Sequence, residues 1–198
     1  MSERFYVLAR DGFAVLAQDL EVDGKPLLDP SGKHYKVPAD FDWKKFIGEL
    51  EGFRASIGGN EAALQGLPDL GGGVVGDTAR TYGLLINRFF ARRPASQDDV
   101  QRTSGHFVPA FRPAASFLYG VACAALGLDE TDALAGGGAH NIVSYLSTFS
   151  FLPEWVRAQL RMGKVDLSGR YWNAAKNVPH IRYGWSSYNN GFRASDKA

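Results

Sequence analysis

Apolar and polar residues alternate over short runs in the first 38 positions. Residues 4–10 and 13–20 flank Asp11-Gly12, a pair that supplies the positive φ angles of a tight hairpin turn. Two more turn signals follow at residues 22–25 and 30–33, and residues 34–38 have the composition of one more short strand. The pattern predicts a small N-terminal β-meander over residues 1–38.

After Pro38 the spacing of apolar residues changes to every third or fourth position, which is typical of helices. We expect Asp40 to cap the first helix, Gly58-Gly59 to end it and Pro179 to end the last one. Residues 94–106 are polar and predict a loop, and the tail from Ser186 is expected to fray. The predicted helices cover about residues 41–57, 74–90, 112–126, 131–147, 153–162 and 169–178. The expected fold class is mostly α (α+β), a compact helical domain over residues 39–198 that forms one unit with the β element.

Composition fits one globular domain made in the cytosol. The chain has 198 residues, of which 45% are hydrophobic, and can bury a core without disulfides. Its single cysteine, Cys123, lies in the apolar run VACAAL, which predicts a buried and inert thiol. The charged N-terminus does not read as a secretory signal, and no window reaches the roughly 20 apolar residues of a membrane span. If the protein leaves the cell, a dedicated apparatus has to carry it.

Charge is unevenly distributed along the chain. The net charge is +1, but residues from 151 onward carry eight Lys or Arg against three acids, while the first 150 carry 14 against 18. The basic C-terminal quarter also contains eight aromatic residues. This asymmetry indicates an anionic partner.

Histidines are the main candidates for chemistry, because no phosphate loop of the G-x-x-x-x-G-K type, no H-E-x-x-H and no C-x-x-C occurs. His34 is expected at the surface, and His106 lies between a loop and a helix. His140 follows three glycines, and Asn141 beside it could orient the ring. His180 has cationic and aromatic neighbours, which suit an anion or a ring. Each of the last three also has a purely structural interpretation, as a loop or core histidine.

Two chemistries fit these residues. Two histidines and a cation can cleave a phosphodiester, and aromatic rings with a carboxylic acid suit a glycan. Asp166 could be that acid or a helix cap, whereas Asp129, Glu130 and Asp132 stand where a cap is expected. The candidate catalytic residues are His106, His140, Asp166 and His180. The candidate substrate-binding residues are Tyr119, Asn141, Tyr171, Trp172, Arg182 and Tyr183. This chemistry calls for no metal and no cofactor.

An aromatic stretch at Ala115–Gly120 precedes a run of small residues, and acids at Asp129–Asp132 and a glycine run at Gly136–His140 follow. With these segments, residues 107–183 resemble the type 44 polymorphic toxin domain of bacteria. In that family an aromatic segment begins a helix of small residues, which ends at an A-A-x-G motif. An acidic linker, a Gly-rich segment and a later acidic segment before an I-x-x-G-x-x-Y helix follow. Ser116 stands where the family has asparagine, and Asp166 is the single acid of the late segment. The matching segments are Ala115–Gly120, Ala124–Leu128, Asp129–Asp132, Gly136–His140 and Asp166–Tyr183.

The resemblance implies a secreted antibacterial effector toxin, delivered into a target cell by a dedicated apparatus such as type VI secretion and neutralised by a cognate immunity protein. Gly136–Gly138 would then let two helices pack closely, so that His140 and the C-terminal end share a cleft. The expected activity is hydrolysis of a bacterial polymer, with peptidoglycan slightly favoured over nucleic acid because the overall charge is near neutral. Two alternatives stay open: a membrane-active toxin that inserts residues 114–128 and 139–152, and a non-enzymatic binding or adaptor module.

Overall fold

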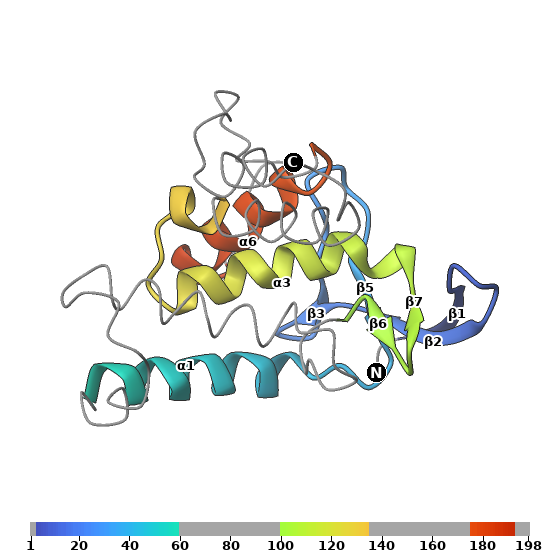
Figure 1. The fold of residues 1–198 in the computed structure, drawn as a ribbon, viewed down its shortest axis with the longest axis horizontal. Helices are drawn as coiled ribbons and strands as arrows, with labels where there is room; N and C mark the ends of the chain where they lie inside the picture. The colour runs from blue at the N-terminus through green and yellow to red at the C-terminus, as the bar shows by residue number, and fades with distance from the viewer. Residues whose placement is uncertain (1–2, 60–99, 135–174, 193–198) are drawn as a thin grey trace, which may run out of the picture.

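The computed structural model describes residues 3–59, 100–134 and 175–192. These residues form a mixed α+β fold in which helix α3 lies between helices α1 and α6, with short antiparallel sheets at the N-terminal end of α3 (Figure 1). The helices predicted at residues 74–90 and 153–162 lie outside the described residues. None of the described helices is long and apolar enough to cross a bilayer.

The first hairpin forms as the alternation predicts. Strand β1 (Arg4–Leu8) pairs antiparallel with β2 (Ala14–Asp19), and β2 pairs with β5 (Lys36–Pro38), which gives the sheet order β1-β2-β5. Gly12 has a φ of +83°, the left-handed conformation that the turn requires. The predicted turn at Asp11-Gly12 is confirmed.

A smaller hairpin lies between β2 and β5. Strands β3 (Glu21–Val22) and β4 (Lys25–Pro26) are joined at Asp23-Gly24, where both residues have positive φ. In the next turn, the Asp29 carboxylate accepts hydrogen bonds from the backbone N–H groups of Ser31 and Lys33. Both turns stand where the sequence predicted them.

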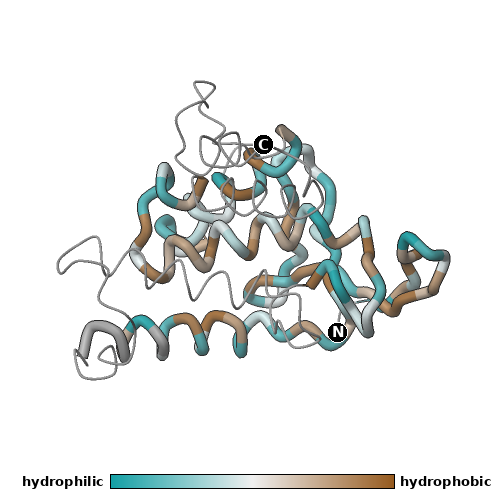
Figure 2. The backbone as a smooth tube through the Cα atoms, in the orientation of Figure 1, coloured by the Kyte–Doolittle hydropathy of each residue, from teal (hydrophilic) through white to brown (hydrophobic). Residues whose placement is uncertain are grey.

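Helix α1 (Trp43–Gly59) begins two residues later than its apolar spacing predicted. The expected cap at Asp40 is wrong, because the carboxylate of Asp42 accepts the Lys45 backbone N–H at 3.0 Å. Hydrophobic and hydrophilic residues alternate along α1 (Figure 2), and Phe46 and Leu50 are buried against the core. The position of the capping oxygen, and not the apolar pattern, therefore sets where the helix begins.

Part of the loop predicted over residues 94–106 is in fact a hairpin. Strands β6 (Arg102–Thr103) and β7 (His106–Phe107) pair around Ser104-Gly105, whose φ angles are +53° and +83°. Strands of two residues are too short to show an alternating pattern. The hairpin leads through the 3₁₀ turn η3 (Pro109–Phe111) into α3.

Helix α3 (Arg112–Ala125) matches its prediction and is buried along nearly its whole length, from Ala114 to Ala125. Cys123 lies in this stretch, fully buried, and burial raises the pKa of its thiol to about 12. The prediction that Cys123 is buried is confirmed. After α3, the carboxylate of Asp129 caps residues 130–134 by accepting the Asp132 backbone N–H at 2.7 Å.

Helix α6 (Val178–Asn189) corrects two predictions. Pro179 lies in the first turn and begins the helix instead of ending one, because a proline there loses no hydrogen bond. Residues 186–189 belong to this helix and are not a frayed tail. His180 consequently lies on a helix and not in a loop.

Helices α3 and α6 pack backbone to backbone at two glycines. A Cβ atom on Gly120 would overlap the carbonyl oxygen of Ile181, and one on Gly184 would overlap the carbonyl oxygen of Phe117. Only glycine permits this approach. The sequence predicted a close helix contact at Gly136–Gly138, which lie outside the described residues; the contact that the structure shows is at Gly120 and Gly184.

Candidate active site

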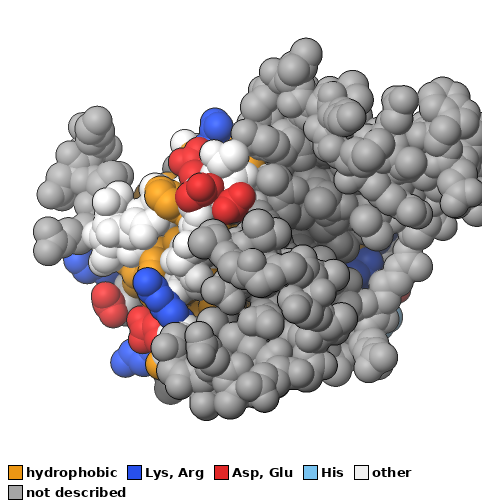
Figure 3. Space-filling view, turned by 60° about the vertical axis from the view of Figure 1, so that its left-hand side comes forward, with side chains coloured by type: hydrophobic (Ala, Val, Ile, Leu, Met, Phe, Trp, Pro, Cys, Tyr) orange, Lys and Arg blue, Asp and Glu red, His pale blue; other side chains and the backbone are white. Residues whose placement is uncertain are grey.

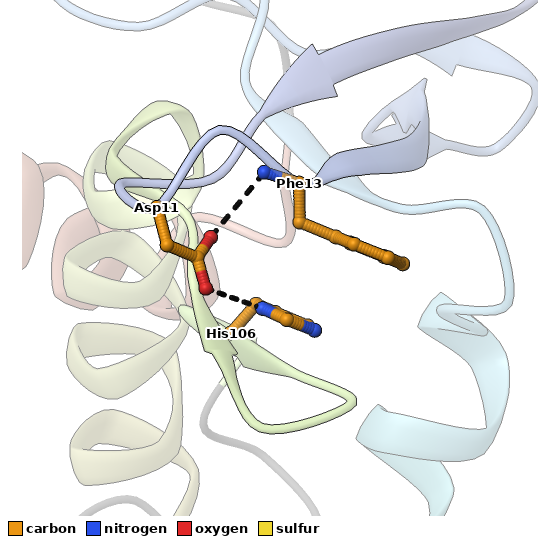
Figure 4. Close-up of polar contacts among 3 residues, drawn as sticks. All are labelled: Asp11, Phe13 and His106. Carbon is orange, nitrogen blue, oxygen red and sulfur yellow. Dashed lines mark hydrogen bonds and ion pairs between the residues drawn. The ribbon is translucent and has the colours of Figure 1, made fainter.

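His106 is held between two hairpins that are distant in the sequence. Its Nδ1 lies 2.7 Å from an oxygen of Asp11, 95 residues away, and its ring stacks on Phe13 with centroids 4.1 Å apart and planes 3° from parallel (Figure 4). The other oxygen of Asp11 accepts the Phe13 backbone N–H at 3.3 Å. The imidazole is therefore fixed in both position and plane.

Backbone pairing brings these groups together. Asp11 lies in the turn between β1 and β2, and His106 opens β7 directly after the turn of the other hairpin. The backbone N–H of Arg10 donates to the carbonyl of Phe107 at 2.8 Å, which joins the two hairpins beside the site. The site depends on two short turns rather than on a core element.

The hydrogen bond to Asp11 determines how His106 holds its proton. A carboxylate only accepts, so Nδ1 is the donor, and Nε2 of the neutral ring is left as an acceptor. The bond from His106 and the bond from the Phe13 backbone lower the pKa of Asp11. An imidazole oriented by a carboxylate is the arrangement of a general base.

His34 forms a second pair of the same kind. Its Nδ1 lies 2.6 Å from Asp19, but its side chain is 47% exposed against 29% for His106. Among the described residues no aromatic ring stacks on it, as Phe13 does on His106. His34 therefore has the same kind of hydrogen bond as His106, but it is more exposed and has no stacked ring among the described residues.

His180 has a different partner. Its Nδ1 lies 3.0 Å from the hydroxyl of Tyr35, whose side chain is only 1% exposed, and the two rings meet edge to face. A buried phenol needs an acceptor and a neutral imidazole nitrogen supplies one, so we assign the hydroxyl as the donor and Nδ1 as the acceptor. The proton of the imidazole is then on Nε2. No local pattern points to Tyr35, since a short strand region predicts nothing about a contact 145 residues away.

Burial keeps both members of this pair neutral. It lowers the pKa of His180, against an opposing effect of the nearby Asp29 carboxylate, and it raises the pKa of Tyr35 far above its ordinary value. For Asp29 itself, burial acts to raise the pKa, but the hydrogen bonds from Ser31 and Lys33 outweigh it and the pKa is lowered. The neutral imidazole of His180 thus lies near the ionised carboxylate of Asp29.

Three predicted substrate-binding residues have intramolecular contacts. Arg182 pairs with Glu130 at 2.8 Å, and the ring of Tyr183 packs against Phe117. Tyr119 is buried, with its hydroxyl donating to the carbonyl of Ala133. Arg182 and Tyr183 flank the crossing of α3 and α6, where these contacts tie α6 to its neighbours.

Other predicted site residues cannot be placed, because His140, Asn141, Asp166, Tyr171 and Trp172 lie outside the described residues. Among the residues that are described, no hydrogen bond, ion pair or ring contact joins His106 to His180. In the same part of the chain, no group of three or more His, Cys, Asp or Glu side chains is arranged to hold a metal ion.

Comparison of the chain with models of known families, with curated proteins and with solved structures finds no match. The resemblance to the type 44 toxin domain therefore stays a prediction.

Sequence reasoning found the imidazoles but missed the residues that orient them. Asp11 was recognised as a turn residue, and its second role depends on a hairpin of two-residue strands. The apolar alternation predicts Phe13 only as part of a strand. The available signal was an acidic residue in a turn, Asp11, and a histidine without an assigned role, His106. A single sequence does not show that the two side chains are in contact.

Proposed function

We propose that this protein is a secreted antibacterial effector toxin that hydrolyses a bacterial polymer, with His106 as the general base. The observation that carries the proposal is the imidazole of His106, bonded through Nδ1 to Asp11 and stacked on Phe13. This arrangement leaves Nε2 to accept a proton and prevents the ring from turning away.

In the proposed reaction, Nε2 of His106 takes a proton from the attacking water as its oxygen bonds to the substrate. Asp11 stabilises the imidazolium that forms, as a carboxylate does when it is bonded to the far nitrogen. The bond to the leaving oxygen breaks, and that oxygen needs a proton from an acid. Asp166 and His140 remain the candidates for this acid.

Peptidoglycan is the favoured polymer. The near-neutral net charge is unlike the basic surface that phosphate binding needs. On the described part of the face in Figure 3, acidic and basic side chains lie among one another. Phe13 is 51% exposed beside His106, and an aromatic ring there suits a sugar face.

The β element of residues 1–38 and the helical domain of residues 39–198 act as one compact unit in this proposal. Asp11 and Phe13 belong to the first and His106 to the second, which supports a site built from both. The partners would be a secretion apparatus such as type VI, which carries the protein from the cytoplasm into the target cell, and a cognate immunity protein.

Expression in a sensitive bacterium tests the proposal. We expect growth arrest when the protein is directed to the periplasm and none when it stays in the cytosol, because the wall is reached only from the periplasm. His106→Ala should abolish the arrest, while His34→Ala, which removes the other carboxylate-bonded histidine, should retain it. A wild type that is harmless in both compartments would refute the toxin, and arrest only in the cytosol would refute the wall as substrate.

Release of soluble wall fragments supplies the biochemical readout. Purified wild type should solubilise peptidoglycan, and His106→Ala should release at least about 100-fold less, the usual contribution of a general base. Equal release by both proteins would show that His106 is not the base.

A further inference from the structure

The outer face of the β1–β2 ribbon is apolar and exposed. Tyr6 and Leu8 on β1 are 72% and 67% exposed, and Leu16 on β2 is 36% exposed. Tyr6 lies directly opposite Leu16, and Leu8 opposite Ala14, so these four side chains share one face. The ribbon lies at the right-hand end of the molecule, and Figure 2 shows hydrophobic residues along it.

Strand β1 also has backbone N–H and C=O groups that point away from the sheet. In the order β1-β2-β5, β1 is an edge strand. The N–H of Ala9 donates across the hairpin to Phe13, so by alternation residues 5 and 7 also bond to β2 while Tyr6 and Leu8 point their N–H and C=O groups outward. Arg10, next in this outward series, donates to Phe107, and no described residue outside the sheet bonds to Tyr6 or Leu8.

Positive charge lies at both ends of this edge. Arg4 and Arg10 are exposed, and among the described residues no carboxylate pairs with either of them. The nearby acids Asp11 and Asp19 are already bonded to histidines. Glu3 precedes the strand, and alternation turns it to the face opposite Arg4.

We propose that the β1 edge binds an extended protein segment that adds to the sheet as a new strand. Apolar side chains of the segment cover Tyr6 and Leu8, its backbone bonds to the outward groups of these residues, and acidic residues at its ends meet Arg4 and Arg10. Exposed edges with this combination of backbone and side-chain groups recruit strands from other chains. This proposal is independent of the hydrolase, because it uses no group of the His106 site.

The test uses the full chain labelled with ¹⁵N and a seven-residue synthetic peptide of alternating valine and threonine with a glutamate at each end. We expect amide shift changes confined to residues 4–8 and 14–18 during the titration. A peptide with lysine in place of each glutamate should bind about fivefold more weakly at low salt, the effect of two exposed ion pairs. Shifts that are absent at millimolar peptide, or that lie elsewhere, overturn the proposal, as does equal binding of both peptides.

Two variants separate backbone from side-chain effects. Tyr6→Ala removes only the ring, whereas Tyr6→Pro also removes an N–H that points away from β2, a position where an edge strand tolerates proline. We expect Tyr6→Pro to bind the peptide about fivefold more weakly than Tyr6→Ala, the loss of about one hydrogen bond. Equal binding by two folded variants, judged by their thermal unfolding, excludes strand addition. If Tyr6→Pro does not fold, Leu8→Lys, which puts a charge in the apolar face that the segment has to cover, should abolish binding, and retained binding refutes the proposal.

A membrane surface is the competing occupant of an apolar face with arginines. Vesicles of phosphatidylcholine and phosphatidylglycerol supply the control. Peptide binding without vesicle binding supports the proposal. Vesicle binding that Tyr6→Ala removes, with no response to the peptide, overturns it.

Discussion

His106 and His180 carry the same side chain but have partners that act in opposite ways. The Asp11 carboxylate accepts a hydrogen bond from Nδ1 of His106, while the Tyr35 hydroxyl donates a hydrogen bond to Nδ1 of His180. His106 therefore offers an acceptor at Nε2, and His180 offers a donor. The neighbour, and not the residue type, decides which half of a proton transfer a histidine can perform.

The two sites also differ in what holds them. His106 depends on two hairpin turns near the surface, whereas His180 lies on a helix whose position is set by the glycine contact with α3. A change in the helix packing should therefore disturb His180 directly. Changes in the turns should affect His106 alone.

The largest effect is expected from Gly184→Ala. The added methyl would overlap the carbonyl oxygen of Phe117, and backbone cannot move aside as a side chain can. We expect the free energy of unfolding to fall by about 3 kcal/mol, the upper range for overpacking, in urea unfolding.

Gly48→Ala is the matched control for this change. Gly48 lies in α1 with no atom within 4 Å of an added Cβ. Alanine there should stabilise the protein by about 1 kcal/mol, the difference in helix propensity. A similar loss of stability in both variants would show that the crossing of α3 and α6 is not close.

Tyr35→Phe should have a smaller effect, about 1 kcal/mol of unfolding free energy, because one buried hydrogen bond is lost. It should also shift the ¹⁵N resonance of His180 Nδ1, which loses the hydrogen bond that it accepts, and long-range ¹H–¹⁵N correlation spectra report this shift directly. The ring resonances of His106 should stay the same. An unchanged Nδ1 resonance of His180 would mean that the hydroxyl does not donate to it.

The smallest effect is on the pH dependence of stability. Burial lowers the pKa of His180 in the folded state, so below its ordinary value of 6.5 the unfolded chain binds the proton first and stability falls with falling pH. The lowered pKa of Asp11 affects stability in a different pH range. It stabilises the folded state above about pH 3.8, and this contribution is lost as the pH falls further.

Unfolding of wild type and His180→Gln between pH 5 and 7 isolates the first window. From pH 7 to pH 5, the free energy of unfolding should fall less in the variant than in wild type. A steeper loss in the variant would reverse the sign of the His180 effect and contradict its burial as a neutral group.

Local signals predicted much of the fold. The turn at Asp11-Gly12 and helix α3 follow from residues adjacent in the chain, where turn chemistry and apolar spacing act. Pro179 was misassigned because proline can either end a helix or begin one, and only the residues beyond it decide.

The candidate site was less predictable for a physical reason. His106 and His180 were identified by residue type, but Asp11 and Tyr35 reach them over 95 and 145 residues. Such contacts result from packing of the whole chain and leave no local pattern. The close contact was likewise expected at the Gly-rich run, whereas single glycines at positions 120 and 184 make the one that the structure shows.

The most direct test of the account compares Asp11→Asn with Asp19→Asn in cells that direct the protein to the periplasm. Each change keeps the size of the side chain and removes the carboxylate that orients one histidine. We predict that Asp11→Asn loses growth arrest, since an amide can hold the imidazole in the wrong tautomer, and that Asp19→Asn retains it. Full toxicity of Asp11→Asn, with the protein folded, would contradict the role of His106 as the general base.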